Sequence, residues 1–566
     1  MSASPRVPSR FPPLQAFVLF AAGLAVAALA WMLPVSLKSV SPALLKAAGA
    51  RTPSLTEFGR QLVESEKIGP AGLVLAAAQS VGDPRAPALA QDLAKLSARQ
   101  PEFVAWGGWD PFLDPIFKLR ENTGRTVSTP VLSFFITEKA RQALRNYLAS
   151  SRSLGVQDVL RTREITSTKR FVPANQPGGQ PLDAVVLLTA LLYQGEHFSP
   201  LLQRELRGLA ETAIERKDMG DLELFYLDLL SLGKRLDWGQ LSELLRRTES
   251  AKTVGEYAHL ARVAPGQLPL IYSAALFADS ADSVASYLIQ YGKAGADDLR
   301  LALSEGQGAV RQLMLRQAPV NHEAGPALGD AAIIALIYPR LTLALKWLGF
   351  FFGAFLLFRA LDCWLVALSG GETERSPVLL HLKSGVLALF AAILLVIATE
   401  PFLLKAAPPS EYRLKLVIPM LAANTVTPAT QPSSQSHSTM DSSTLISIGV
   451  FALLQVVVYT ICLFKIREID REDISPMLKL RLLENEDNLF DSGLYIGMMG
   501  TATALVLQVL GVIQPNLLAA YSSNLFGIVC VALVKIRHVR GYKRRLIVAS
   551  QPSTLPPAGR ATSLAS

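Results

Sequence analysis

The sequence predicts an all-α, polytopic membrane protein with about six transmembrane helices and a large extracytoplasmic α-helical domain. Half of the 566 residues are hydrophobic and only 18% are charged, whereas soluble domains carry about 25% charged residues. Several uncharged runs reach the roughly 20 residues that a helix needs to cross a bilayer. Between the first and second of these runs lie some three hundred residues with the apolar spacing of amphipathic helices.

The first predicted span covers residues 15–34, inside an uncharged run between Arg10 and Lys38. We interpret residues 1–34 as an N-terminal transmembrane anchor or a signal-like segment. Ala28-Leu29-Ala30 has the small-x-small form of a signal cleavage site. The apolar character continues beyond that site, which favours a retained anchor over cleavage. Under either interpretation, the chain that follows is exported.

Residues 35–330 are predicted to form the exported helical domain. Capping residues precede apolar helical stripes at three places, namely Thr137, Asp237 with Gln240, and Thr253 with Glu256. Successive helix starts at similar intervals are compatible with stacked helical hairpins, as in a helical repeat. The Pro/Gly-rich segment 171–183 is interpreted as a loop, or as a linker between two helical lobes.

An aromatic stretch, residues 106–117, contains two Asp-Pro turns. Exposed Trp106 and Trp109 would form a binding site. Aromatic side chains buried against a turn are the alternative, and we favour it because large aromatic residues contribute much of the apolar area in cores.

Five more spans are predicted after the exported domain, near residues 343–367, 385–404, 444–464, 493–513 and 516–535. Residues 331–404 are thus predicted to contain transmembrane helices 2 and 3, and residues 405–443 a partly disordered extracytoplasmic loop. Residues 444–535 are predicted to contain transmembrane helices 4 to 6, with a charged cytoplasmic loop at 466–492. Residues 536–566 are predicted to form a basic cytoplasmic tail. Basic residues are much more numerous near one set of span ends than in the opposite short loop, which holds only Lys405, Arg413 and Lys415. This asymmetry predicts a bacterial-type inner-membrane protein with both termini in the cytoplasm and residues 35–340 outside.

Motifs for catalysis are absent from the sequence. No phosphate-binding glycine loop, metalloprotease helix or nucleophile elbow occurs. The six histidines lie in separate segments and the three cysteines stand singly. We therefore predict no catalytic residue, no cofactor and no metal site, and expect that the protein is not an enzyme.

Two ionisable residues lie within the second predicted span. Arg359 and Asp362 are three residues apart and so share one side of a helix. Charged residues are costly inside a bilayer and usually face an interior, a partner or a path. We interpret the two as a structural intramembrane ion pair, with an ion route as the alternative.

The last predicted hairpin carries small and polar residues at helical spacing. Gly493, Gly497, Gly500 and Ala504 would let a second helix approach closely. The predicted polar seam of this hairpin consists of Thr501, Thr503, Gln508, Ser522, Ser523 and Asn524. Helix packing explains this pattern, because hydroxyl groups can bond to their own backbone; a hydrated path is the alternative.

The hairpin also resembles a known family. The run Ile496-Gly-Met-Met-Gly-Thr-Ala502 is similar to the G-L-L-G-T-V stretch of the MotA/TolQ/ExbB proton-channel family. Residues 520–527, AYSSNLFG, are similar to that family's following helix. The resemblance implies a pentameric pore lined by Thr501 and by Ser522 or Ser523, around a partner's membrane helix that carries an acidic residue.

The net charge of +9 falls largely near the membrane. Five basic residues of the tail, Arg537, Arg540, Lys543, Arg544 and Arg545, are predicted to contact anionic lipid rather than nucleic acid. The sequence thus predicts a non-enzymatic envelope scaffold or binding component that interacts with membrane lipids and with an envelope protein partner or copies of itself. A channel or proton-motive-force-coupling subunit is the alternative, and a secondary transporter a weaker one.

Overall fold

The computed structural model describes residues 12–119, 127–322, 325, 327–368, 377–400, 402, 412, 442–509 and 517–550. These residues are helical with no β-strand among them, which confirms the predicted all-α fold class. The chain divides into two compact units. We call Leu29–Lys346 the helical domain, and the described segments before and after it the membrane unit.

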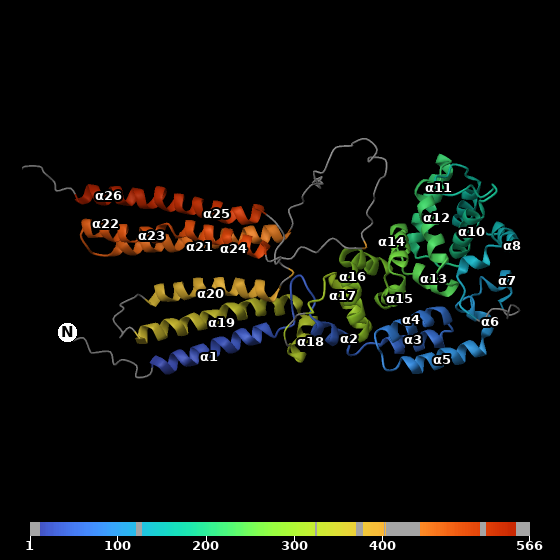
Figure 1. The fold of residues 1–566 in the computed structure, drawn as a ribbon, viewed down its shortest axis with the longest axis horizontal. Coiled ribbons are helices and arrows are strands. Elements are labelled where there is room, and N and C mark those ends of the chain that lie inside the picture. The colour runs from blue at the N-terminus through green and yellow to red at the C-terminus, as the bar shows by residue number, and fades with distance from the viewer. Residues whose placement is uncertain are drawn as a thin grey trace, which may run out of the picture. The chain divides into compact units, whose positions relative to one another are not determined.

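The helical domain is built from short helices that follow one another with brief connections (Figure 1). They are α2 (Pro42–Gly49), α3 (Leu55–Glu64), α4 (Ile68–Ser80), α5 (Ala86–Arg99), α6 (Pro101–Val104), α7 (Asp114–Phe117), α8 (Glu138–Ala149), α9 (Leu154–Arg161), α10 (Gln180–Gln194), α11 (Pro200–Arg216), α12 (Gly220–Gly233), α13 (Trp238–Leu245), α14 (Ala251–Val263), α15 (Leu268–Ala278), α16 (Ala281–Glu305), α17 (Gln307–Arg316) and α18 (Gly329–Ile337). One continuous core of buried Leu, Val, Ala and aromatic side chains runs through these helices.

Two of the three predicted helix caps are confirmed. The Thr137 side chain accepts from the backbone N–H of Ala140 at the start of α8, and Asp237 with Gln240 forms a complete capping box on α13. The third cap was misplaced by one turn. Ser250, not Thr253, caps α14, and Thr253 instead supplies the N–H that Ser250 binds.

Helices that follow one another pack together, but the chain also returns on itself. Helix α2 contacts α17 and α18, and α4 contacts α15. Glycines permit the contacts of α2 with α16 and α17, since a Cβ added to Gly49 would lie 2.1 Å from the carbonyl oxygen of Glu305, at the end of α16, and one added to Gly308 of α17 would lie 2.1 Å from that of Ala48. The domain therefore closes its first helices against its last ones, instead of forming an open repeat array.

The membrane unit contains the helices predicted to span the bilayer. They are α1 (Pro12–Trp31), α19 (Pro339–Leu368), α20 (Pro377–Thr399), α21 (Ser442–Arg471), α24 (Ser492–Val509) and α25 (Leu517–Ala532), with the short α22 (Pro476–Asn485) and α23 (Asp487–Phe490) between α21 and α24. A π-helical turn (Leu533–Val539) and α26 (Arg540–Ser550) continue α25.

Three stretches of helix within the described residues are long and apolar enough to cross a membrane, fewer than the six predicted. They are Leu14–Trp31, Pro339–Leu365 and Tyr521–Ser550, while Lys383–Thr399 is apolar but shorter. Most of the predicted loop 405–443, the turn at Pro515 and residues 551–566 lie outside the described residues.

Candidate functional site

A small polar pocket lies in the helical domain where the aromatic stretch 106–117 meets α13. Its volume is about 200 Å³. The side chains used in the argument below are Lys67, Trp109, Asp110, His197, Glu243 and Arg246, all of which line it. They come from the residue preceding α4, the aromatic stretch, the α10–α11 connection and α13.

Glycines bring the two walls of the pocket together. Gly107 and Gly108 have φ values of +79° and +143°, which residues with a Cβ rarely adopt. A Cβ on Gly107 would lie 2.2 Å from Asp237 Oδ1, and one on Gly239 would lie 2.6 Å from the carbonyl oxygen of Gly107. The backbone of the aromatic stretch therefore reaches the start of α13 only because these positions lack side chains.

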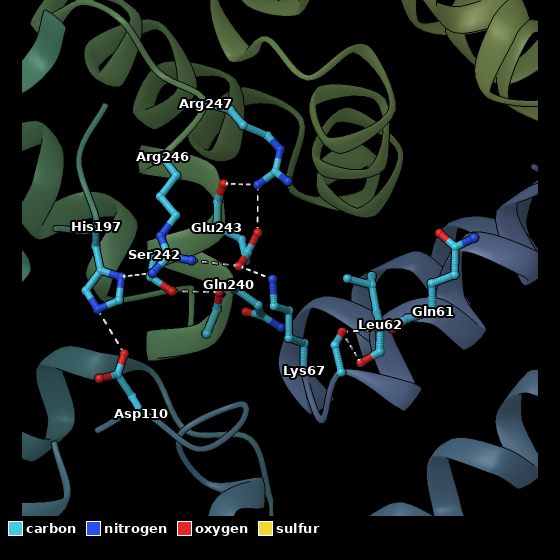
Figure 2. Close-up of polar contacts among 12 residues, drawn as sticks. Gln61, Leu62, Lys67, Asp110, His197, Gln240, Ser242, Glu243, Arg246 and Arg247 are labelled. Carbon is cyan, nitrogen blue, oxygen red and sulfur yellow. Dashed lines mark hydrogen bonds and ion pairs between the residues drawn. The ribbon is translucent and has the colours of Figure 1, made fainter. Parts of the chain in front are cut away.

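His197 links the two sides of the pocket. Its Nδ1 lies 2.9 Å from Arg246 Nη2. Because a guanidinium only donates, Nδ1 must accept, and the ring proton is assigned to Nε2. That nitrogen faces Asp110 Oδ2 at 2.8 Å, as Figure 2 shows. Trp238 also donates its indole N–H to Asp110 Oδ2, at 2.9 Å.

The Asp110 carboxylate is kept ionised in spite of its burial. Burial raises its pKa, but the hydrogen bonds from His197 and Trp238 outweigh this effect and hold the pKa below its usual range. Asp110 therefore remains an acceptor for both groups at neutral pH, and the ring of His197 is fixed between Asp110 and Arg246.

Glu243 organises the cations of the pocket. Lys67 Nζ lies 2.6 Å from its Oε1, Arg247 Nη1 lies 2.7 Å from its Oε2, and Arg246 Nη1 approaches Oε1 at 3.4 Å (Figure 2). Burial raises the pKa of Glu243, yet the bonds from Lys67 and Arg247 lower it below the usual value. The carboxylate therefore holds Lys67 and Arg246 at the wall of the pocket, and it also binds Arg247, which does not line the pocket.

The two tryptophans of the aromatic stretch have different environments. Trp106 is 2% exposed and stacks on Phe134 with ring centroids 3.7 Å apart, as the favoured interpretation of buried aromatics predicted. Trp109 is 45% exposed and lines the pocket, so that interpretation was wrong for this residue.

Sequence reasoning missed most of this site. Lys67 and Glu243 are 176 positions apart, and Trp238 and Asp110 are 128 apart. No spacing pattern connects residues so distant in the chain. The local signals were the two Asp-Pro turns of residues 106–117, which indicated turns but not the residues that they meet.

The membrane hairpin places the predicted small residues at a close helix contact. A Cβ on Gly497 would lie 2.9 Å from the Ser523 carbonyl oxygen, and one on Gly500 would lie 2.3 Å from Ser523 Oγ. Gly493 faces α25 as well, near Cys530. The side chains of Ala504, Thr503 and Gln508 lie outside the described residues.

Two hydroxyl groups of the predicted polar seam bond to backbone. Thr501 and Ser523 both donate to the Gly497 carbonyl oxygen at 3.1 Å. Ser522 is partly buried. Asn524 Oδ1 is buried and has no hydrogen-bond partner among the described residues. Packing thus occupies the hydroxyls of Thr501 and Ser523, while the Asn524 amide oxygen has no hydrogen-bond partner in the part of the chain that the structure describes.

Replacing Gly527 with alanine is expected to destabilise this hairpin by about 1–3 kcal/mol, because overpacking forces backbone shifts. The added Cβ would lie 2.6 Å from the Gly493 carbonyl oxygen. The measurement is the thermal unfolding midpoint of the full-length protein in one detergent. Gly541→Ala in α26 is the control, since no heavy atom lies within 4 Å of its added Cβ. Equal midpoints for the two variants would contradict the close packing.

Arg359 and Asp362, which the sequence predicts to form an intramembrane ion pair, are not paired with each other in the described residues. Asp362 accepts from Ser384 Oγ at 2.7 Å and from Lys383 Nζ at 3.2 Å, both on α20. Arg359 Nη1 is buried with no hydrogen-bond partner among the described residues. The partner of Asp362 therefore differs from the prediction. Lys383 on α20 supplies the cation, so that Asp362 joins α19 to α20.

Among the described residues, no group of three or more His, Cys, Asp or Glu side chains is placed to hold a metal ion. Comparisons of the chain with known protein families, with curated proteins and with solved structures find no match.

Proposed function

We propose that the protein is a bacterial-type inner-membrane protein whose exported helical domain binds an envelope protein partner. In this proposal six helices span the membrane, both termini are cytoplasmic and residues 35–340 lie outside. The three long apolar helices support membrane insertion. The contact between Gly23 of α1 and Gly353 of α19, where an added Cβ on Gly23 would lie 2.9 Å from the Gly353 oxygen, supports a retained first helix.

The proposal rests on one observation. The exposed side chain of Trp109 and the side chain of Arg246 both line the same preformed pocket. Tryptophan and arginine are the residue types most enriched among the side chains that dominate protein–protein binding energy. The Arg246 guanidinium is already oriented by His197 and Glu243, so less conformational entropy is lost when it binds.

The size of the pocket favours a protein partner over a metabolite. Its volume of about 200 Å³ is below the roughly 300–1,000 Å³ of small-molecule sites. One inserted side chain of a partner fits such a volume, with Trp109 and the charged rim contacting the surface around it.

The chemistry of the pocket supports binding rather than catalysis. A histidine that acts as a general base needs a free ring nitrogen within reach of a substrate proton. His197 Nδ1 contacts Arg246 Nη2 at 2.9 Å, and its Nε2 is buried 2.8 Å from Asp110 Oδ2, so neither nitrogen is open to the pocket for a substrate. Ser242, the hydroxyl residue of the pocket, donates to the Gly239 carbonyl oxygen at 3.1 Å. His197 therefore acts as a bridge that holds Arg246 in place.

Photo-crosslinking in the native membrane tests the proposal. A crosslinking amino acid at position 109 of the full-length protein is expected to give a discrete protein adduct, and the same group at Leu315, an 82% exposed position of the same domain, is expected to give none. Arg246→Ala should lower the adduct yield at least tenfold, because truncating a dominant contact costs about 2 kcal/mol or more.

The matched control is Arg300→Ala. Arg300 is half-exposed and pairs with Asp297 three residues away at 3.4 Å, as Arg246 does with Glu243. This variant should leave the adduct unchanged. An adduct at position 109 that survives Arg246→Ala, or that appears equally at position 315, would contradict the proposal.

A channel or energy-coupling subunit is the second proposal. The resemblance of residues 496–527 to the MotA/TolQ/ExbB family supports it, together with two buried amide oxygens, Gln455 Oε1 and Asn524 Oδ1, that have no hydrogen-bond partner among the described residues. Such oxygens would line a hydrated path. Proton flux into proteoliposomes that is lost in Asn524→Leu and kept in Thr501→Val would favour it; no flux in the unmodified protein would refute it.

A further inference from the structure

A second cavity lies beside the helix that follows the last predicted span. Its volume is about 600 Å³, within the range of small-molecule sites. One stripe of the π-turn and α26 forms most of its wall, with Lys535, Arg540, Lys543 and Arg544 as the basic lining residues. Asp487 lines it from α23.

The cavity holds cations that no protein group neutralises among the residues that the structure describes. Asp487 is already paired with Lys535 at 3.3 Å, and Lys535 lies 2.7 Å from Asp491 as well. No ion pair or hydrogen bond joins Arg540, Lys543 or Arg544 to any side chain in the described part of the chain. The cavity therefore carries an excess of positive charge, which would attract an anionic ligand.

Packing fixes the direction in which this basic stripe points. Tyr542 and Leu546, on the other side of α26, are buried in a cluster with Leu483 of α22. The helix is therefore held on its apolar side, and the basic side remains open. The π-turn Leu533–Val539 lies at the start of this region, and π-bulges are frequent at functional sites.

Helix length places the cavity at the membrane surface. A span needs about 20 residues at 1.5 Å per residue. If α25 enters at Leu517, the hydrocarbon region ends near the π-turn, and Arg540 follows within roughly one helical turn. The open cations then lie at the level of lipid phosphates on the face predicted to be cytoplasmic.

We propose that Arg540, Lys543 and Arg544 form a binding site for the phosphate-bearing headgroup of an anionic phospholipid. Arginine guanidinium groups match phosphate oxygens with paired hydrogen bonds, and basic pockets beside membrane helices on this face take such headgroups. The site refines the predicted lipid contacts, since Arg537 and Arg545 do not line the cavity. It requires membrane insertion of α25 and is independent of partner binding by the helical domain.

The test measures lipid retention by the full-length protein. The protein is reconstituted in phosphatidylcholine nanodiscs that contain a small fraction of phosphatidylglycerol or cardiolipin, and the lipids retained after release into detergent are counted by native mass spectrometry. The double variant Arg540→Gln/Arg544→Gln is expected to lose at least tenfold of the retained anionic lipid.

The control variant is Arg537→Gln/Arg545→Gln, which removes the same charge from exposed positions of the same segment outside the cavity. It should retain anionic lipid within about threefold of the unmodified protein, as expected when surface charge alone contributes weakly. Equal loss in both variants would overturn the proposal and indicate a diffuse basic surface. Displacement of the lipid by millimolar inorganic phosphate would also overturn it and identify free phosphate as the ligand.

Discussion

Replacing Asp183 with alanine is expected to destabilise the helical domain by about 3–5 kcal/mol, because it removes the buried counter-ion of Arg141 and leaves that buried cation with the largely exposed Glu138. Asp183 lies on α10 and pairs with three arginines: Arg141 Nε at 3.0 Å, Arg163 Nε at 2.7 Å and Arg145 Nη2 at 3.3 Å. The side chain of Arg141 is 4% exposed and that of Asp183 5%. Removing the carboxylate would leave the Arg141 guanidinium in the interior, with Glu138, whose side chain is 65% exposed, as its remaining counter-ion among the described residues.

Urea unfolding of the full-length protein in detergent measures this effect through Trp106, Trp109 and Trp238, which all lie in the helical domain. Asp297→Ala is the control, because Asp297 and its partner Arg300 are both about half exposed. Exposed pairs contribute about 1 kcal/mol or less. A loss below about 1 kcal/mol in Asp183→Ala would show that Arg141 is satisfied by the carbonyl oxygens of Phe135 and Ile136 instead.

Features set by local sequence were predictable, and features set by distant contacts were not. The capping box at Asp237 and Gln240 depends on two residues three positions apart, so the sequence contains all of its determinants. The pocket around His197 depends on segments that are far apart in the chain and meet only in the folded domain, where the first helices pack against later ones. Even Trp109 was misjudged, because its exposure depends on what α13 leaves uncovered.

The same distinction applies to the membrane unit. Uncharged length predicted where helices lie, and small residues at helical spacing predicted the close contact of α24 with α25. The partner of Asp362 was missed because i,i+3 spacing favoured Arg359 on the same helix. The structure instead uses Lys383 of the neighbouring helix α20, whose position relative to Asp362 depends on helix packing.

The stability of the helical domain is expected to fall as pH rises from about 5 to 8, through the ionisation of Asp237. This residue is 1% exposed, and burial raises its pKa to about 7, although bonds from Ser128 Oγ and the Gln240 N–H partly oppose the shift. The groups that donate hydrogen bonds to Asp237 are neutral, so none of them offsets the free-energy cost of burying its charge.

The sign of the effect follows from proton binding. Between the unfolded-state pKa near 3.8 and the folded-state pKa near 7, the folded chain holds a proton at Asp237 that the unfolded chain has released. Unfolding then releases this proton, so raising the pH favours the unfolded state. The slope approaches about 1.4 kcal/mol per pH unit, and the loss between pH 5 and 8 is roughly 2.5 kcal/mol.

Asp237→Asn isolates this contribution from that of other titrating groups. The amide keeps an oxygen for the Gln240 N–H at the start of α13 but cannot ionise, and Ser128 can accept from its NH₂ group. The free energy of unfolding should therefore be measured in urea at pH 5, 6, 7 and 8. Between pH 5 and 8 it should fall by roughly 2.5 kcal/mol less in the variant than in the unmodified protein. Parallel pH profiles would mean that Asp237 is already ionised at pH 5, and that hydrogen bonds at the helix start stabilise its charge more than burial opposes it.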